Sequence, residues 1–280
     1  MANPVFSNSP IFQDPNARKG GSNARTAAPE STIDAVTLEK MYAGAPATPR
    51  QMGRLTYDDV IVKTGSLLAL LVVVAAATWA VTPQVPWLYL VGALVGLVLG
   101  LVNSFRREPS PALIIAYTIA EGVFVGGISY LFQNFAVEGT TDGTAQPIVL
   151  QAVIATMVTF AAALALFKSG KVRVTPKFTK WLLIAMVGYL AFSLVNVVLW
   201  FFMPSDGFGP LRNGGWGIVV GLFAVGLAAA CLIMDFDSIK RGVEAGAPAK
   251  FAWSAAFGLI VTLVWLYLEF LRIFAMFTRN

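Results

Sequence analysis

The fold is decided by residues 231–276, which read CLIMDFDSIKRGVEAGAPAKFAWSAAFGLIVTLVWLYLEFLRIFAM. Two apolar runs are joined here by a short polar segment, and the second run contains Glu269 and Arg272. Charged side chains are costly inside hydrocarbon, so a carboxylate within such a run indicates a functional site. We interpret the rest of the chain as the membrane scaffold that holds these residues.

The composition indicates an all-α, polytopic membrane protein. Of the 280 residues, 57% are hydrophobic and 12% are charged, whereas soluble domains average about 25% charged residues. The net charge of +5 does not indicate nucleic-acid binding, because the basic residues lie in short turns between apolar runs, where they set the topology. The expected partner is the lipid bilayer, and no nucleic acid is expected.

The residue types that most often carry enzymatic and metal chemistry are scarce. The chain has one cysteine, Cys231, and no histidine, so it cannot form an intrachain disulfide or a thiolate metal site. Any pH response near neutrality must then come from carboxylates. The sequence also lacks a G-x-S-x-G elbow, an H-E-x-x-H motif and a P-loop. We therefore expect neither an enzyme nor a bound cofactor.

The chain divides into a tail and a membrane domain. Residues 1–54 are rich in Ala, Pro, Ser, Asn, Thr and Gly, a composition typical of disorder. Residues 55–280 contain seven apolar runs, each close to the roughly 20 residues that cross about 30 Å of hydrocarbon, and backbone hydrogen bonding in lipid requires them to be helices. The predicted helices span 62–81, 86–104, 111–135, 148–167, 179–203, 216–235 and 251–277.

The distribution of basic residues predicts the orientation. Seventeen of the twenty Lys and Arg residues lie in the tail through Lys63 or in the second, fourth and sixth turns. The positive-inside rule then places the tail and the N-terminus in the cytoplasm and the C-terminus outside a cell (inner) membrane. Asp58 and Asp59 come just before the first run and are predicted to begin its helix.

Four carboxylates lie in or against apolar sequence, and each is a candidate for an ion pathway or a pH sensor. Glu121 is about ten residues from either end of its run, so it lies about 15 Å deep. It is either a protonated Glu hydrogen-bonded inside the bundle or a group that takes part in ion or proton passage. Asp235 and Asp237 diverge by about 200° on a helix, so Asp235 is expected to face inward and Asp237 to be solvated at the cytoplasmic edge.

Glu269 is the fourth carboxylate, and Arg272 is the one cation predicted within a span. Their i, i+3 spacing places them on one helix face, where they can form an ion pair. This pair is either purely structural or a lock that a proton or a cation can open.

Several of these segments resemble the Bax-inhibitor-motif family of membrane proteins, in its bacterial branch. The resemblance rests on MDFDSIKRG at the end of the sixth run, AEGVFVGGIS in the third and LYLEFLRIF in the last, and it covers the chain from about Leu55 onward. It implies a pH-sensitive calcium leak in which an aspartate ending the sixth helix shares a proton with one in the seventh. Asp235 matches the first of these aspartates.

Two residues are candidates for the position of the family's second aspartate. Alignment on LYLEF places Glu269 there, whereas alignment on FLRIF places Thr262 there. Glu269 is expected to lie roughly 32 Å along its helix, which makes a direct hydrogen bond to Asp235 doubtful. Thr262 would instead lie at the depth of Asp235, with Glu269 about 10 Å farther along the same face and Glu121 between them across the bundle.

The leading hypothesis is a cation pathway, for calcium or protons, that is gated by protonation of intramembrane carboxylates. Asp235 and Glu269 could bind calcium transiently, because oxygen ligands suit this ion. The alternative hypothesis is a membrane-embedded regulator that binds a membrane protease or a stress factor.

Overall fold

The computed structural model describes residues 52–138, 147–170, 174–203 and 209–279. The predicted tail, 1–54, therefore lies almost entirely outside the described residues. Within them, seven helices are long and apolar enough to cross a membrane, as the sequence predicts. They are α3 (Tyr57–Val81), α4 (Leu88–Phe105), α5 (Pro111–Glu138), α6 (Ile148–Lys168), α7 (Pro176–Phe202), α8 (Gly214–Glu244) and α9 (Ala252–Arg279).

Two helices extend well beyond their predicted ends, because polar residues continue them. α3 begins at Tyr57, where the Thr56 side chain caps the helix by accepting a hydrogen bond from the Asp59 amide at 3.2 Å. Asp58 and Asp59 lie in the first turn, which confirms their predicted place. α8 continues nine residues past Asp235 to Glu244, so Asp235 lies about 14 Å from the end of its helix.

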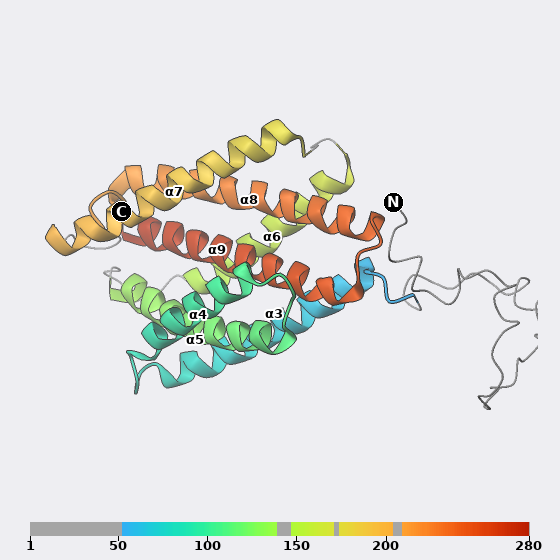
Figure 1. The fold of residues 1–280 in the computed structure, drawn as a ribbon. Helices are drawn as coiled ribbons and strands as arrows, with labels where there is room; N and C mark the ends of the chain where they lie inside the picture. The colour runs from blue at the N-terminus through green and yellow to red at the C-terminus, as the bar shows by residue number, and fades with distance from the viewer. Residues whose placement is uncertain (1–51, 139–146, 171–173, 204–208, 280) are drawn as a thin grey trace, which may run out of the picture. The chain divides into compact units, whose positions relative to one another are not determined.

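The central helix is α9, which packs against α3, α5, α6 and α8. Figure 1 shows α9 in red between α7 and α8 on one side and α3, α4 and α5 on the other. α4 and α7 are peripheral, since α4 packs mainly on α5 and α7 mainly on α8. Large apolar side chains such as Leu94 on α4 and Ile184 on α7 are exposed, as expected for surfaces that face lipid.

Glycines bring α3, α4 and α5 into close contact. A Cβ atom added to Gly92 on α4 would lie 2.7 Å from the Phe124 amide nitrogen on α5, and one added to Gly126 on α5 would lie 2.2 Å from the Ala75 carbonyl oxygen on α3. The four-residue spacing of glycines in these runs is typical of such helix contacts. These glycines therefore let the three helices pack closely.

One end of the bundle is held together by the turn between α8 and α9. The Leu55 amide donates to the Ala247 carbonyl at 2.7 Å, and the Ala249 amide donates to the Gly53 carbonyl at 2.8 Å. The Lys250 ammonium donates to Glu108, between α4 and α5, at 2.8 Å. Three segments far apart in the sequence therefore meet where α9 begins.

Replacing Lys250 with methionine is expected to raise the pKa of Glu108. The hydrogen bond from Lys250, followed by the charge of Lys250, holds the pKa of this exposed carboxyl below its ordinary value. The contact is therefore complete above the ordinary pKa and is lost as the pH falls through the lowered one. A carbon-13 NMR titration of labelled glutamate side chains measures this shift. Lys240→Met, which removes a contact to Glu244, should leave Glu108 unchanged; an equal shift in both variants would contradict the assignment.

Candidate functional site

The clearest polar contact inside the bundle joins α8 to α9. The Thr262 hydroxyl on α9 donates to Asp235 Oδ2 on α8 at 2.8 Å and also lies 3.2 Å from the Gly258 carbonyl oxygen. Thr262 is buried and Asp235 is half-buried. Among the described residues, Asp235 has no basic partner. The contact therefore leaves the Asp235 carboxylate without a compensating positive charge.

A second polar group lies farther along α9, around Glu269. We call it the Glu269 cluster; its members come from α7, α9 and the turn before α8 and are Tyr189, Ser193, Arg212, Trp265, Glu269 and Arg272. Glu269 is only 2% exposed. Arg272 donates to its Oε2 atom at 2.7 Å, which confirms the predicted ion pair.

The other carboxylate oxygen of Glu269, Oε1, contacts three further side chains. The Tyr189 hydroxyl donates to it, Trp265 Nε1 donates at 3.2 Å, and Arg212 Nη1 lies 3.9 Å away. Arg212 also donates to Ser193 at 2.8 Å. Glu269 therefore lies beside two arginines, whereas Asp235 has no basic partner among the described residues.

Arg212 reaches the cluster because the turn before α8 folds onto α7. The Leu211 amide donates to Asn196 Oδ1 at 3.0 Å. Gly209 has a φ of +96°, and a Cβ atom there would lie 2.5 Å from the Asn196 side-chain nitrogen, so this position requires glycine. The Arg212 guanidinium then lies 5.0 Å from the centre of the Tyr189 ring, which favours a buried cation.

Glu121 lies elsewhere, at the interface of α4 and α5. A Cβ atom at Gly96 on α4 would lie 2.7 Å from Glu121 Oε2, so the glycine makes room for the carboxylate. In the described part of the chain Glu121 makes no hydrogen bond or ion pair. It is thus a second intramembrane carboxylate without a positive partner.

Asp237 pairs with Arg241, one turn along α8, at 3.1 Å. Its side chain is 20% exposed and that of Arg241 is 62% exposed. This position fits the edge of the bundle that the sequence predicts for Asp237, on the opposite face from Asp235.

The structure thus joins the predicted residues in two separate pairs. Asp235 meets Thr262, and Glu269 meets Arg272; neither Asp235 nor Glu269 has the other among its hydrogen-bond partners in the described residues. The same residues include no group of three or more Asp, Glu, Cys or His side chains that could hold a metal ion.

Sequence reasoning missed Arg212, Tyr189 and Ser193. Arg212 lies in the turn before α8, where a basic residue is expected to be solvated, yet it is only 5% exposed. One signal was available: Tyr189 and Ser193 are spaced i, i+4 in a largely apolar run, which places two hydroxyls on one helix face. Their partner lies in a turn nineteen residues beyond Ser193, and no local pattern indicates such a contact.

The fold and these contacts define a multi-pass membrane protein whose central helix, α9, carries buried polar side chains. The chain matches the family model described as Bax inhibitor 1 like over residues 3–279. It therefore belongs to the Bax inhibitor 1 like family. A search of curated proteins finds no match.

Proposed function

We propose that this protein is a pH-sensitive leak for cations, calcium or protons, and that Asp235 controls it. The proposal is supported above all by the contact between Asp235 and Thr262, in which an intramembrane carboxylate has a hydroxyl partner and no described basic one. An isolated carboxylate is costly in a membrane. Uptake of a proton or a cation relieves that cost, and both are the ions that such a leak would pass.

The position of this contact suggests how it would control the bundle. Asp235 and Thr262 join α8 to the central helix α9 by a single hydrogen bond between side chains. Protonation of Asp235 weakens this bond, because a charged acceptor binds a hydroxyl more strongly than a neutral one. The two helices could then separate locally at this depth, about 10 Å along α9 from the Glu269 cluster.

The Glu269 cluster would serve as the fixed end of this movement. Glu269 on α9 is bonded to Tyr189 on α7 and lies 3.9 Å from Arg212 in the turn before α8, and Arg212 in turn donates to Ser193 on α7. Between a single hydrogen bond at Asp235 and a network at Glu269, the single bond breaks more readily. We therefore assign the pH response to Asp235 and the anchoring of α9 to Glu269.

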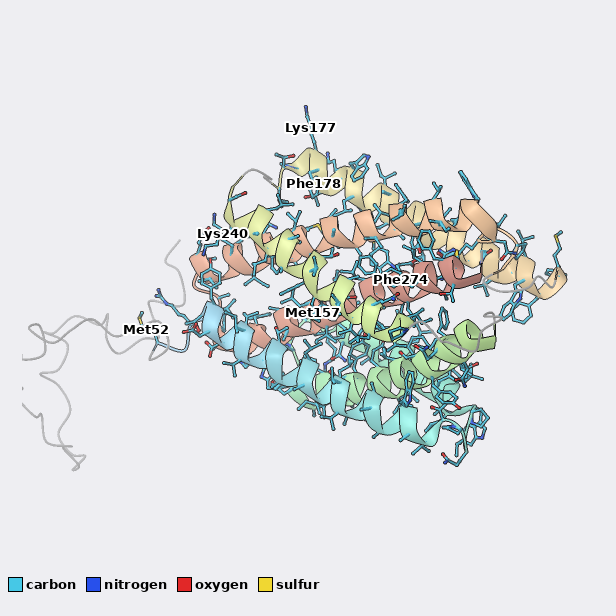
Figure 2. All side chains as sticks on the ribbon, turned by 180° about the vertical axis from the view of Figure 1, so that it is seen from behind. Met52, Met157, Lys177, Phe178, Lys240 and Phe274 are labelled. Atoms are coloured by element: carbon cyan, nitrogen blue, oxygen red, sulfur yellow. The ribbon has the colours of Figure 1, made fainter. Side chains whose placement is uncertain are left out.

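The proposed orientation places the Asp235 side of the bundle toward the cytoplasm of a cell membrane. Figure 2 shows Met52 and Lys240 at one end of the bundle and Phe274 toward the other. The described turns at the first end contain Arg106, Arg107 and Lys250, among other basic residues. An excess of Lys and Arg is typical of cytoplasmic turns.

Substitution of Asp235 by asparagine is expected to remove the pH dependence of cation flux. A single titrating carboxylate changes its ratio of charged to neutral forms about tenfold per pH unit, and asparagine cannot titrate. Calcium and proton flux into proteoliposomes containing the full chain, measured across about pH 5 to 8, tests this. Flux in Asp235→Asn should vary less than about twofold over the range in which the wild type responds.

Two further variants make the test specific. Asp237→Asn removes a neighbouring carboxylate that is paired with Arg241, and it should keep the wild-type pH dependence. Thr262→Val removes the donor of the hydrogen bond that protonation is proposed to weaken, so its flux should also lose most of its pH dependence. If the folded wild-type protein passes neither ion at any pH, the leak proposal is wrong, and a regulator that binds a membrane protease or a stress factor becomes the better hypothesis.

A further inference from the structure

A cleft on the side of the bundle opposite α7 has no part in the proposed leak. It is a cavity of about 430 Å³ that lies between α3 and α6 and is floored by α5 and α9. Figure 2 looks onto this side, with α3 in blue, α6 in yellow-green and Met157 of α6 labelled. α3 and α6 both pack on α9, but among the described residues they do not pack closely on each other. We call this cavity the lateral cleft.

The lateral cleft is open to the surface that faces lipid. Its rim includes Val72 on α3 and Val153 and Met157 on α6, whose side chains are 56%, 42% and 40% exposed. Its floor is formed by buried residues such as Val125 and Leu263. Because the rim belongs to two spanning helices with exposed apolar faces, the cleft is continuous with the surface that the hydrocarbon of the bilayer covers.

The chemistry of the lining excludes water and ions as stable occupants. No charged side chain lines the cleft, and its hydroxyls already have partners. Ser129 donates to the Val125 carbonyl and is bonded to the Tyr267 hydroxyl at 2.6 Å, and Thr156 donates to the Ala152 carbonyl at 2.7 Å. A buried water requires two to four polar partners, so the cleft favours hydrocarbon.

The dimensions of the cleft fit one lipid chain. Its lining runs along α3 from Leu68 to Trp79, a rise of about 17 Å, close to the roughly 15 Å that one leaflet contributes to the hydrocarbon core. A helix segment of that length and about 10 Å in diameter would occupy on the order of 1,300 Å³, about three times the volume of the cleft. The cleft therefore cannot enclose a transmembrane helix of a second copy, which could only lie across its rim.

The position of the cleft also specifies how such a chain would lie. Trp79, at the end of the cleft near the end of α3, makes an edge contact with Tyr130 at 5.6 Å between ring centres. Trp and Tyr side chains are typical of the membrane interface, so the head group would lie at this end and the chain would run inward along α3. We propose that the lateral cleft binds one acyl chain of a membrane phospholipid.

Photo-crosslinking tests this proposal on the full chain in detergent micelles, to which a photoreactive phospholipid is added in increasing amounts. The probe is a phosphatidylcholine with a diazirine in the middle of one acyl chain, and adducts are located by mass spectrometry. We expect adducts at Val72, Val153 and Met157 that saturate at a low fraction of the probe. The exposed neighbours outside the cleft, Val73 and Ile154, should react in proportion to that fraction. Equal, non-saturating labelling of both sets would overturn the proposal.

Matched variants separate the cleft from the rest of the lipid-facing surface. Ala76→Phe places a ring in the cleft, and Ala77→Phe places the same ring on the next residue, which is exposed and does not line it. Labelling of Val153 should fall about tenfold in the first variant, a change that corresponds to about 1.4 kcal/mol of binding, and should be unchanged in the second. Unchanged labelling in both variants, or crosslinks between two copies through the cleft, would contradict it.

A second pair of variants tests the proposal even if Ala76→Phe does not fold. Val153→Phe fills the cleft from α6, and Ile154→Phe is its exposed control. In this pair the readout is labelling of Val72. It should fall in Val153→Phe alone, and an equal fall in both variants would overturn the proposal.

Discussion

Replacing Glu269 with glutamine is expected to lower the free energy of unfolding by about 3 kcal/mol or more, the cost of removing one member of a buried ion pair. The carboxylate is buried between Arg272, which donates to it at 2.7 Å, and Arg212, whose nearest guanidinium nitrogen is 3.9 Å away. Glutamine retains the shape of the side chain but leaves both guanidinium groups without a counter-charge. Unfolding of the purified protein in detergent, followed by circular dichroism, measures the change.

Two comparisons show whether the buried charge causes this loss. Glu244→Gln removes an exposed carboxylate that pairs with Lys240 at 3.8 Å, and such surface pairs contribute about 0–1 kcal/mol. Adding Arg212→Met to Glu269→Gln removes one of the uncompensated cations and should restore part of the lost stability. A Glu269→Gln variant as stable as Glu244→Gln would show that the ion pairs of the cluster contribute little to the fold.

The number and order of the helices could be predicted from the sequence, because apolar length in a membrane protein leaves few alternatives. The ends of the helices were less predictable. α8 continues through Lys240 and Arg241 to Glu244 because i, i+4 pairs, at 3.8 Å and 3.1 Å, stabilise its polar end. Hydropathy marks where a helix leaves hydrocarbon, and it carries no information on how far the helix extends into water.

Side-chain contacts within one helix or between neighbouring helices could also be predicted from the sequence. The spacing of Glu269 and Arg272 predicts their contact, and helix depth favours Thr262 over Glu269 as the partner of Asp235, which is the contact that the structure has. Arg212 could not be placed, because its burial depends on how Asn196 of α7 holds the turn before α8. Topology rules treat turns between spans as solvated, so they do not predict a buried arginine there.

The polar contacts of α9 differ along its length. Its Glu269 section is bonded to α7 and to Arg212, and its Thr262 section is joined to α8 by one side-chain hydrogen bond. Leu263 and Tyr267, which line the lateral cleft, lie between these two sections. A chain bound in the cleft would therefore contact α9 between its two polar sections.

Replacing Gly126 with alanine is expected to destabilise the fold by about 3 kcal/mol, at the upper end of the usual range for overpacking. The new Cβ atom would lie 2.2 Å from the Ala75 carbonyl oxygen and 2.9 Å from the Ala75 carbonyl carbon and Cα. These are backbone atoms, so no change of rotamer relieves the overlap and α3 must move away from α5. The free energy of unfolding in detergent measures the effect.

Gly188→Ala is the matched control, because nothing lies within 4 Å of a Cβ atom at that position on α7. Alanine is favoured over glycine in a helix by about 1 kcal/mol, a gain that both variants share in principle. Gly188→Ala should therefore be as stable as the wild type or slightly more stable. Since only the contact with Ala75 distinguishes the two variants, equal stability would mean that α3 and α5 are not held as close together as this packing requires.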